Sequence, residues 1–407
     1  MSIDYIPYNN PNLSLKNIKD FFSLKNKESE LIEFFKNYTG KKYILPTFSC
    51  RSALYLAYRS LNKTGGVITS PLTCLTAILP VIHSNNTPVF IDIDEETYNF
   101  KTDLIEEEIS EKTIALQVIH FAGYPCDMET ITRIAKKKNI YIVEDCAQAF
   151  GAKYKNINVG SFGDISCFSL AKNLYGIVGG IYATDIEEFY LRAKKIQEKF
   201  EEPSQIFLLY RFLRNYLKAN SRNFFYRFLY KKLIQLKNFQ KSSESEEDIS
   251  SLTNYLKKPD KKFFNISLSQ IKKIPGLHKQ REQIAEKLIE QINKMSSIKT
   301  PQNNKDVKRS FVKFYISGNF DSQKDIINLN SKGIEARHLE EDDSSYYQIR
   351  FDKNPVFKDN KSLARCTNYL KIHDKLISLP LSEGMTNKDV KNIIDSLSKL
   401  IHNSLYE

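Results

Sequence analysis

Between residues 42 and 185, short apolar runs rich in β-branched residues alternate with helical segments, and this alternation limits the possible folds more than any other feature. In the segment Asp127–Lys138, apolar residues recur every three to four positions, as in an amphipathic helix. The predicted strands are Gly66–Ser70, Pro88–Asp94, Thr113–His120, Asn139–Asp145, Ser166–Leu170 and Gly179–Thr184. The pattern predicts an α/β fold with a mostly parallel central sheet flanked by helices. Ligands of such sheets bind at the carboxyl ends of the strands.

The later part of the chain predicts a second, smaller domain. A long helical stretch at Asn265–Lys294 precedes apolar runs at 311–316, 333–338 and 376–381, and a helix at Asn387–His402 closes the pattern. We therefore expect a large domain over residues 1–270 and a smaller C-terminal α+β domain over residues 271–407.

The composition excludes a wholly disordered chain, because 41% of the residues are hydrophobic and 27% are charged. No apolar stretch approaches the roughly 20 residues of a membrane-spanning helix, and residues 1–14 lack a signal-peptide pattern. These features predict a soluble cytoplasmic protein. The six cysteines show no metal-ligand spacing, so we expect reduced thiols and no metal site.

Lys172 is the residue with the strongest chemical signal. It lies just after a predicted strand and before Gly176, Gly179 and Gly180, which allow backbone to approach a ligand closely. A lysine amine in a partly desolvated pocket can form a Schiff base with an aldehyde cofactor. The alternative is an ordinary solvated lysine.

Asp145 and Gln148 form a second candidate group, directly after the apolar strand 140–143. A carboxylate at that strand end can hold a pyridine nitrogen protonated, and Gln148 can donate to a ring hydroxyl. The alternative is that Asp145 only caps the following helix.

A polar turn at Ser49, Cys50 and Arg51 begins an amphipathic helix. The free N–H groups and the positive dipole end of such a helix favour a phosphate. The alternative is a plain serine N-cap.

Taken together, these residues resemble the DegT/DnrJ/EryC1/StrS family of pyridoxal-phosphate (PLP) aminotransferases, which have fold type I and transfer amino groups to nucleotide-linked keto-sugars. The resemblance covers roughly residues 6–185 and 265–400. Its motifs are SCRSALYLA from Ser49, PVFIDID from Pro88, HFAGYPCDM from His120, EDCAQAFG from Glu144, VGSFGDISCFS from Val159 and LISLPLSEGMT from Leu376.

The resemblance implies a role for each candidate residue. Lys172 is the Schiff-base lysine, Asp145 the partner of the pyridine nitrogen and Gln148 the partner of the ring hydroxyl. Ser169, with the turn at Cys50 and Arg51, is the phosphate cradle. Asn265 reaches the phosphate of the neighbouring subunit, which implies a homodimer with shared active sites.

Three departures from the family pattern stand out. Ser169 and Lys172 are three residues apart instead of five, a spacing found in other fold-type I aminotransferases. Cys74 occupies the position that usually supplies a ring to stack on the cofactor. The family's N-Y-R is Asn265-Ile266-Ser267 here, so its arginine is missing.

Lysine instead of histidine at position 172 favours transamination over the dehydratase chemistry of a related branch. By resemblance, the amino donor is glutamate and the product serves surface glycan or glycoconjugate synthesis. Two weaker substrate candidates are His120 and Arg337. For His120, a packed structural histidine is the favoured alternative, and for Arg337 a solvated surface arginine is an equal alternative. The competing hypothesis is a catalytically retired family member that acts as a membrane-associated scaffold or regulator.

Residues 188–262 interrupt the α/β pattern as a helical insert. Its residues 206–241 include nine basic residues, ten aromatic residues and no acidic residue. Four basic residues recur on one helical face: Arg211, Arg214, Lys218 and Arg222. We expect one amphipathic helix, or two with a break near Asn220, lying outside the cofactor site.

This basic, aromatic stretch is compatible with three functions. Packing of its aromatic residues on its own domain or on a dimer mate is favoured. Peripheral contact with an anionic membrane through residues 206–241 is the alternative, because basic amphipathic helices bind such surfaces. Nucleic-acid binding is not expected, because no accompanying motif is present.

Overall fold

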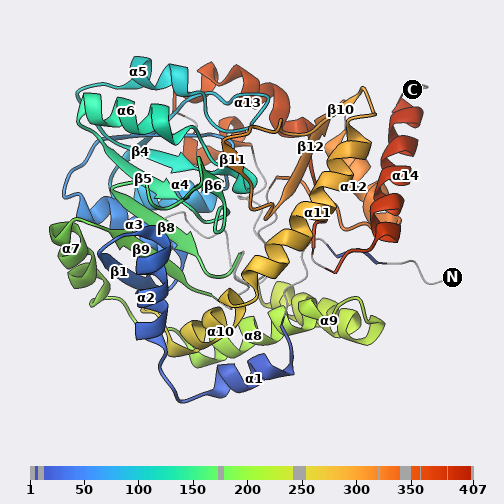
Figure 1. Cartoon of the computed structure of the whole chain (residues 1–407), viewed down its shortest axis with the longest axis horizontal. Coiled ribbons are helices and arrows are strands. Elements are labelled where there is room, and N and C mark those ends of the chain that lie inside the picture. The colour runs from blue at the N-terminus through green and yellow to red at the C-terminus, as the bar shows by residue number, and fades with distance from the viewer. Residues whose placement is uncertain are drawn as a thin grey trace.

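The computed structural model describes residues 5–7, 13–172, 178–241, 254–319, 321–339, 350–357, 359–382 and 384–404 (Figure 1). Over these residues, a central sheet with helices on both faces forms the large domain, and a smaller α+β unit lies beside it. A pair of helices from the insert runs along one edge of both (Figure 1).

In the described chain, the central sheet has seven strands in the order β1-β9-β8-β5-β4-β2-β3. They are β1 (Tyr43–Thr47), β2 (Gly66–Thr69), β3 (Thr87–Phe90), β4 (Thr113–Ile119), β5 (Tyr141–Asp145), β8 (Ile165–Ser169) and β9 (Gly180–Thr184). Of these described strands, β9 alone runs against its neighbours, so the mostly parallel sheet is confirmed. Sequence reasoning missed β1, and β3 ends four residues earlier than expected.

The two faces of the sheet are covered by different helices. Successive side chains of β5 point to opposite faces: Ile142 packs with α6 (Met128–Lys138), whereas Val143 packs with α3 (Cys50–Ser60) and α7 (Glu187–Gln197). The other helices of this domain are α1 (Leu15–Phe22), α2 (Glu28–Thr39), α4 (Leu75–His83), α5 (Ile105–Glu108) and α10 (Lys261–Ile271). A small sheet combines β6 (Lys153–Tyr154), β7 (Ile157–Asn158) and β11 (Val307–Lys308).

The smaller unit is built on a sheet of β10 (Ile298–Lys299), β12 (Phe314–Gly318) and β13 (Leu376–Leu379). Its helices are α11 (Ile274–Ile292), α12 (Ser322–Ser331), α13 (Thr367–Ile372) and α14 (Asn387–Ser404). Ile6, close to the N-terminus, packs into this core and pairs with Ile334. The division at residue 270 stays a prediction.

Two expectations for this region need correction. The stretch Asn265–Lys294 is two helices rather than one, because α10 ends at Ile271 and α11 begins at Ile274 with Pro275 in its first turn. Proline has no N–H to donate and suits a helix start. Residues 333–338 form isolated bridges instead of a strand.

The insert forms two helices, α8 (Gln205–Ala219) and α9 (Phe224–Lys241), with the expected break at Asn220. Its expected start at residue 188 is wrong, because Phe189 and Ala193 of α7 are buried in the core beside α3. None of the described helices combines the length and the apolarity that crossing a bilayer requires.

Basic residues of α8 are half-buried, and these residues and Arg222, in the turn after the helix, contact other parts of the protein. Arg214 lies against Tyr230 of α9, and Arg222 pairs with Asp389 of α14 at 3.0 Å. Burial raises the pKa of Glu335, but the charges of Arg337 and Lys218 outweigh this effect and hold it below its ordinary value. These charges are therefore used in packing the insert against the smaller unit.

Gly180 provides a test of how closely the chain packs where β9 passes the start of α3. A Cβ atom on Gly180 would lie 2.4 Å from the carbonyl carbon of Ser49 and 2.6 Å from the nitrogen of Cys50. We expect Gly180→Ala to lower the unfolding free energy by about 1–3 kcal/mol, because backbone must move. Gly276→Ala in α11 is the control, since a Cβ there meets no atom within 4 Å. Urea unfolding in which both variants match wild type would contradict this expectation.

Candidate active site

A cavity of about 840 Å³ opens at the carboxyl ends of β5 and β8, beside the N-terminus of α3. Seven of the nine candidate residues line it: Cys50, Arg51, His120, Asp145, Gln148, Ser169 and Lys172. They come from segments far apart in the sequence, so their meeting at one cavity is a property of the fold. Cys74, at the position expected for a stacking ring, also lines the cavity.

Lys172 is half-buried and follows the last residue of β8, Ser169, by three positions. The hydroxyl of Ser169 accepts a hydrogen bond from the N–H of Ala171 at 3.3 Å. Leu170 donates its N–H to the carbonyl of Gly179 at 2.9 Å, which ties the two arms of this turn together. The turn therefore holds Lys172 at the cavity wall.

Asp145 ends β5 and is 3% exposed. Its Oδ1 accepts the N–H of Ala147 at 3.0 Å. Burial raises the pKa of Asp145, and the Ala147 N–H and the charge of Lys172 offset this only in part. A buried carboxylate of this kind is suited to a cationic partner in the cavity.

The amide of Gln148 has a defined orientation. Its Oε1 accepts the N–H of Ala122 at 3.0 Å, so the NH₂ end is the one that can donate into the cavity. The backbone carbonyl of Gln148 accepts a hydrogen bond from Ser310 Oγ at 3.0 Å, which fixes the segment from behind.

The N-terminus of α3 faces the cavity and offers N–H groups suited to an anion. Ser49 caps the helix by accepting the N–H of Ser52 at 3.2 Å, so the serine-cap alternative is correct for this side chain. The cap does not exclude a phosphate, because the first turn of any helix has further N–H groups without intrahelical partners. Cys50 and Arg51 stand at this turn.

His120 is held by hydrogen bonds at both ring nitrogens. Nδ1 accepts the N–H of Cys126 at 3.1 Å, so Nε2 carries the hydrogen and donates to Glu144 at 3.1 Å. Glu144 also accepts the N–H groups of Gly160 and Gly163. Although His120 borders the cavity, its nitrogens are engaged, which favours the packed structural histidine over a substrate contact.

Asn265 and Arg337 lie away from the cavity. Asn265 is 1% exposed and donates from Nδ2 to the carbonyls of Asp20 and Lys25, so it is built into this chain's own core under α1. Arg337 pairs with Glu335 and bridges to Ser378 in the smaller unit. The role of Asn265 toward a neighbouring subunit and that of Arg337 toward the substrate therefore stay predictions.

Sequence reasoning missed one wall of the cavity, which comes from the insert, and the expectation that the insert lies outside the cofactor site stays a prediction. Phe207 and Arg211 of α8 line the cavity, as does Tyr255, which follows α9. The spacing of four between Phe207 and Arg211 placed them on one face, but the sequence offered no signal for what that face meets.

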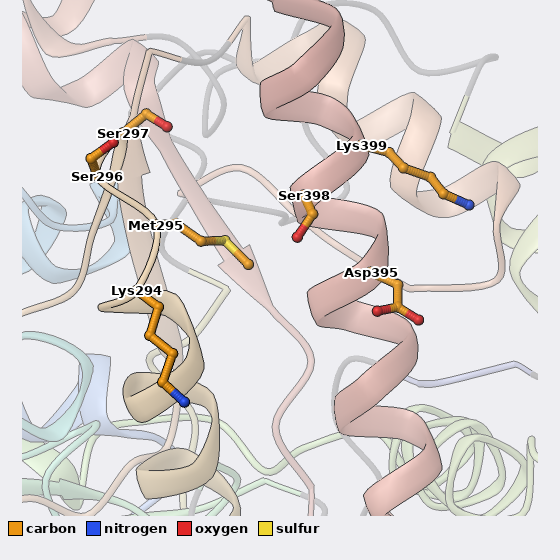
Figure 2. Close-up of a pocket in the computed structure, with 7 residues that line it drawn as sticks. All are labelled: Lys294, Met295, Ser296, Ser297, Asp395, Ser398 and Lys399. Atoms are coloured by element: carbon orange, nitrogen blue, oxygen red, sulfur yellow. The ribbon is translucent and has the colours of Figure 1, made fainter.

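A second hollow, of about 650 Å³, lies between the end of α11 and α14 (Figure 2). Figure 2 shows Lys294 to Ser297 on one side and Asp395, Ser398 and Lys399 of α14 on the other. Lys294 is paired with Glu290 at 3.1 Å. The residues lining this hollow include no histidine, cysteine or aromatic group, and it holds none of the candidate residues.

Comparison with known proteins identifies the chain's relatives. The model of the DegT/DnrJ/EryC1/StrS aminotransferase family matches residues 16–202 and 260–398. The chain belongs to this aminotransferase family. It is therefore a PLP-dependent transaminase, and the expected fold type, enzyme class and cofactor are confirmed.

Three similar proteins illustrate the relationship. An uncharacterised protein of Methanocaldococcus jannaschii is 30% identical over 388 residues, which are 94% of this chain and 92% of that protein. The GDP-perosamine synthase of Escherichia coli O157:H7 is 41% identical over 144 residues, 34% of this chain and 40% of that protein. A solved sugar aminotransferase structure from Streptococcus pneumoniae, in its PLP form, has a TM-score of 0.75 and 20% identity, covering 96% of this chain and 97% of that chain.

The residues around the cavity fit PLP chemically. The buried Asp145 carboxylate matches a protonated pyridine nitrogen, because an opposite charge relieves the burial that raises its pKa. Lys172 offers an amine for the aldehyde, and the start of α3 offers N–H groups for the phosphate. Lys172, Asp145, Gln148, Ser169, Cys50 and Arg51 all line this cavity, and their roles toward the cofactor stay predictions.

Glu144 predicts how stability depends on pH. Burial opposes ionisation of Glu144, but hydrogen bonds from His120, Gly160 and Gly163 outweigh it and hold its pKa below the ordinary value of 4.5. A lowered folded-state pKa gives stability that is present above about pH 4.5 and is lost as the pH falls through the folded-state value. We expect Glu144→Gln to lower the unfolding free energy at pH 7 by roughly 1–3 kcal/mol, because the bonds lose their charged acceptor.

The same variant should lose less stability than wild type between pH 7 and pH 4, because it has no carboxyl group to protonate at position 144. Urea unfolding at the two pH values measures both effects. Equal pH dependence in the two proteins would show that the Glu144 network does not contribute as described.

Proposed function

We propose that this transaminase moves an amino group from an amino-acid donor, glutamate, to a nucleotide-linked keto-sugar in surface glycan or glycoconjugate synthesis. The observation that carries the proposal is the meeting of Lys172, Asp145 and Gln148 at one cavity beside the N-terminus of α3. The family, and the GDP-perosamine synthase among its similar proteins, support a sugar acceptor.

When bound, PLP supplies an aldehyde to accept the amine and a ring that withdraws electrons from the reacting carbon. Asp145 keeps the ring nitrogen protonated, because its buried carboxylate gains a cationic partner. Lys172 Nζ would bind the aldehyde of the cofactor and would move the proton at the reacting carbon. The turn from Ser169 to Ala171 keeps this amine at the cavity wall.

Gln148 and the start of α3 orient the cofactor. The NH₂ group of Gln148 donates to the ring hydroxyl, since Ala122 already occupies its Oε1. Ser169 and the backbone at Cys50 and Arg51 bind the phosphate. The small Ala147 lines the cavity between Asp145 and Gln148 and leaves room for a flat ring.

A catalytically retired scaffold is not favoured. A retired protein has no need to keep a lysine, a buried aspartate and an oriented glutamine around one cavity, and this chain has all three. Cys74 removes a stacking ring but none of the acid-base groups.

The donor half of the reaction tests this proposal. Asp145→Asn should keep the fold, yet slow the glutamate-dependent loss of the cofactor's visible absorbance by at least about a hundredfold, because an amide cannot hold the ring nitrogen protonated. Stopped-flow absorbance with L-glutamate measures the rate, and Lys231→Gln on the exposed surface of α9 is the control. An Asp145→Asn rate near that of wild type, or no spectral change in wild type with any amino acid, would contradict the proposal.

We also propose a homodimer, which rests on the family resemblance, and a peripheral membrane contact through residues 206–241. For the membrane contact, the supporting residues differ from those first expected, because the basic face of α8 is used in packing. The exposed residues of α9 combine apolar rings with charge: Phe224 and Phe225 are 74% and 62% exposed, and Lys231 and Lys232 are exposed near them in sequence. Rings and lysines of this kind suit an anionic bilayer surface.

Vesicle binding tests the membrane contact. Wild-type protein should sediment with phosphatidylserine vesicles at low salt and less so at high salt, because salt screens the lysines. Replacing both Lys231 and Lys232 with glutamine should weaken binding by roughly thirtyfold, at about 1 kcal/mol for each charge. Arg222→Gln is the control, since Arg222 is engaged with Asp389. Wild-type protein that stays in the supernatant at low salt would discard the membrane contact.

A further inference from the structure

The insert forms a wall of the catalytic cavity that the family model does not contain. The family model leaves residues 203–259 unmatched. Among the described residues of this segment, seven line the cavity: Pro203, Ser204, Phe207, Arg211, Asn254, Tyr255 and Lys257. The residues proposed to bind PLP lie in the matched part. This wall is therefore available to bind the acceptor substrate, in which family members differ.

The α8 side of the wall is fixed by apolar packing. Leu208 and Phe212 are buried in the main core, at 0% and 3% exposure. The Phe212 ring stacks on Phe21 of α1 with centroids 4.5 Å apart. With these two residues facing the core, Phe207 and Arg211 share a neighbouring face, one turn apart, and both reach the cavity.

The other side of the wall is fastened to α3. Ser52 Oγ of α3 donates to the carbonyl of Tyr255 at 2.6 Å. The hydroxyl of Tyr255 is hydrogen-bonded to Nδ1 of His83 at 2.8 Å, and the residue is 1% exposed. The guanidinium of Arg51 lies over the Tyr255 ring, 5.5 Å from its centroid. The insert is therefore joined to the helix whose N-terminus is the proposed phosphate cradle.

The wall brings positive charge into the cavity. Arg51 and Arg211 both line it, one from α3 and one from α8. Lys257 also lines it but forms an ion pair with Glu201. Guanidinium groups bind phosphate oxygens through paired N–H donors, which makes arginine the usual residue for phosphate recognition.

We infer that the insert recognises the nucleoside diphosphate portion of the acceptor. Arg211 and Arg51 bind the phosphates, and Phe207, 41% exposed at the cavity wall, contacts the nucleoside. The inference rests on the proposed function, because it takes the acceptor to be a nucleotide-linked sugar. It goes further in naming the residues that recognise that acceptor, two of which, Phe207 and Arg211, lie outside the part matched by the family model.

Calorimetric titration of the PLP-loaded protein tests the inference. The probes are UDP, GDP and dTDP, with the matching nucleosides as phosphate-free counterparts. Arg211→Gln should weaken the best-binding diphosphate about tenfold, a loss expected for one charged hydrogen bond, and should leave nucleoside affinity unchanged. Phe207→Ala should weaken diphosphate and nucleoside alike. Lys231→Gln, which removes an exposed charge elsewhere in the insert, should match wild type.

Three results would overturn the inference. One is unchanged diphosphate affinity in Arg211→Gln. Another is a loss of PLP affinity in that variant with diphosphate affinity intact, which would assign Arg211 to the cofactor phosphate. The third is a wild-type protein that binds none of the three diphosphates at millimolar concentration. The donor half-reaction with L-glutamate is measured on the same samples, so failure of the transaminase proposal is seen separately from failure of the insert's role.

Discussion

The end of β5 determines the geometry of the site, because two adjacent carboxylates there have different roles. Glu144 is bonded within the protein, and Asp145 lines the cavity. Glu144 is buried and accepts hydrogen bonds from His120, Gly160 and Gly163, which joins β4, β5 and the loop before β8. Asp145, the next residue, lines the cavity, because successive side chains of a strand point to opposite faces. The hydrogen bonds of Glu144 thus hold the adjacent Asp145 in place. Burial raises the pKa of Asp145, so its carboxylate is suited to a cationic partner.

Much of this arrangement could be predicted from sequence, because it depends on local pattern. The parallel strands and the placing of Asp145, Gln148 and Lys172 at strand ends follow from short apolar runs followed by polar residues. Contacts over long sequence distances could not be predicted. Arg222, between α8 and α9, pairs with Asp389, which lies 167 residues later in the chain. Likewise, Asn265 donates hydrogen bonds to the carbonyls of Asp20 and Lys25, which lie 240 or more residues earlier in the chain.

The insert contacts several parts of the molecule through different residues. Leu208 and Phe212 pack in the main core, Arg222 pairs with Asp389 of the smaller unit, and Arg211 lines the cavity. The residues proposed to bind the cofactor lie in the part matched by the family, whereas residues outside that match form another wall of the same cavity. One helix, α8, thus packs in the core through Leu208 and Phe212 and lines the cavity through Phe207 and Arg211.

The central claim is that this cavity holds PLP through Lys172. The most direct measurement is borohydride reduction of the PLP-loaded protein, which makes the lysine–cofactor bond permanent, followed by peptide mass mapping. If PLP binds through Lys172, the phosphopyridoxyl group is found on Lys172 and on no other lysine. Modification of a different lysine, or a PLP-loaded protein in which Lys172 stays unmodified, would contradict it.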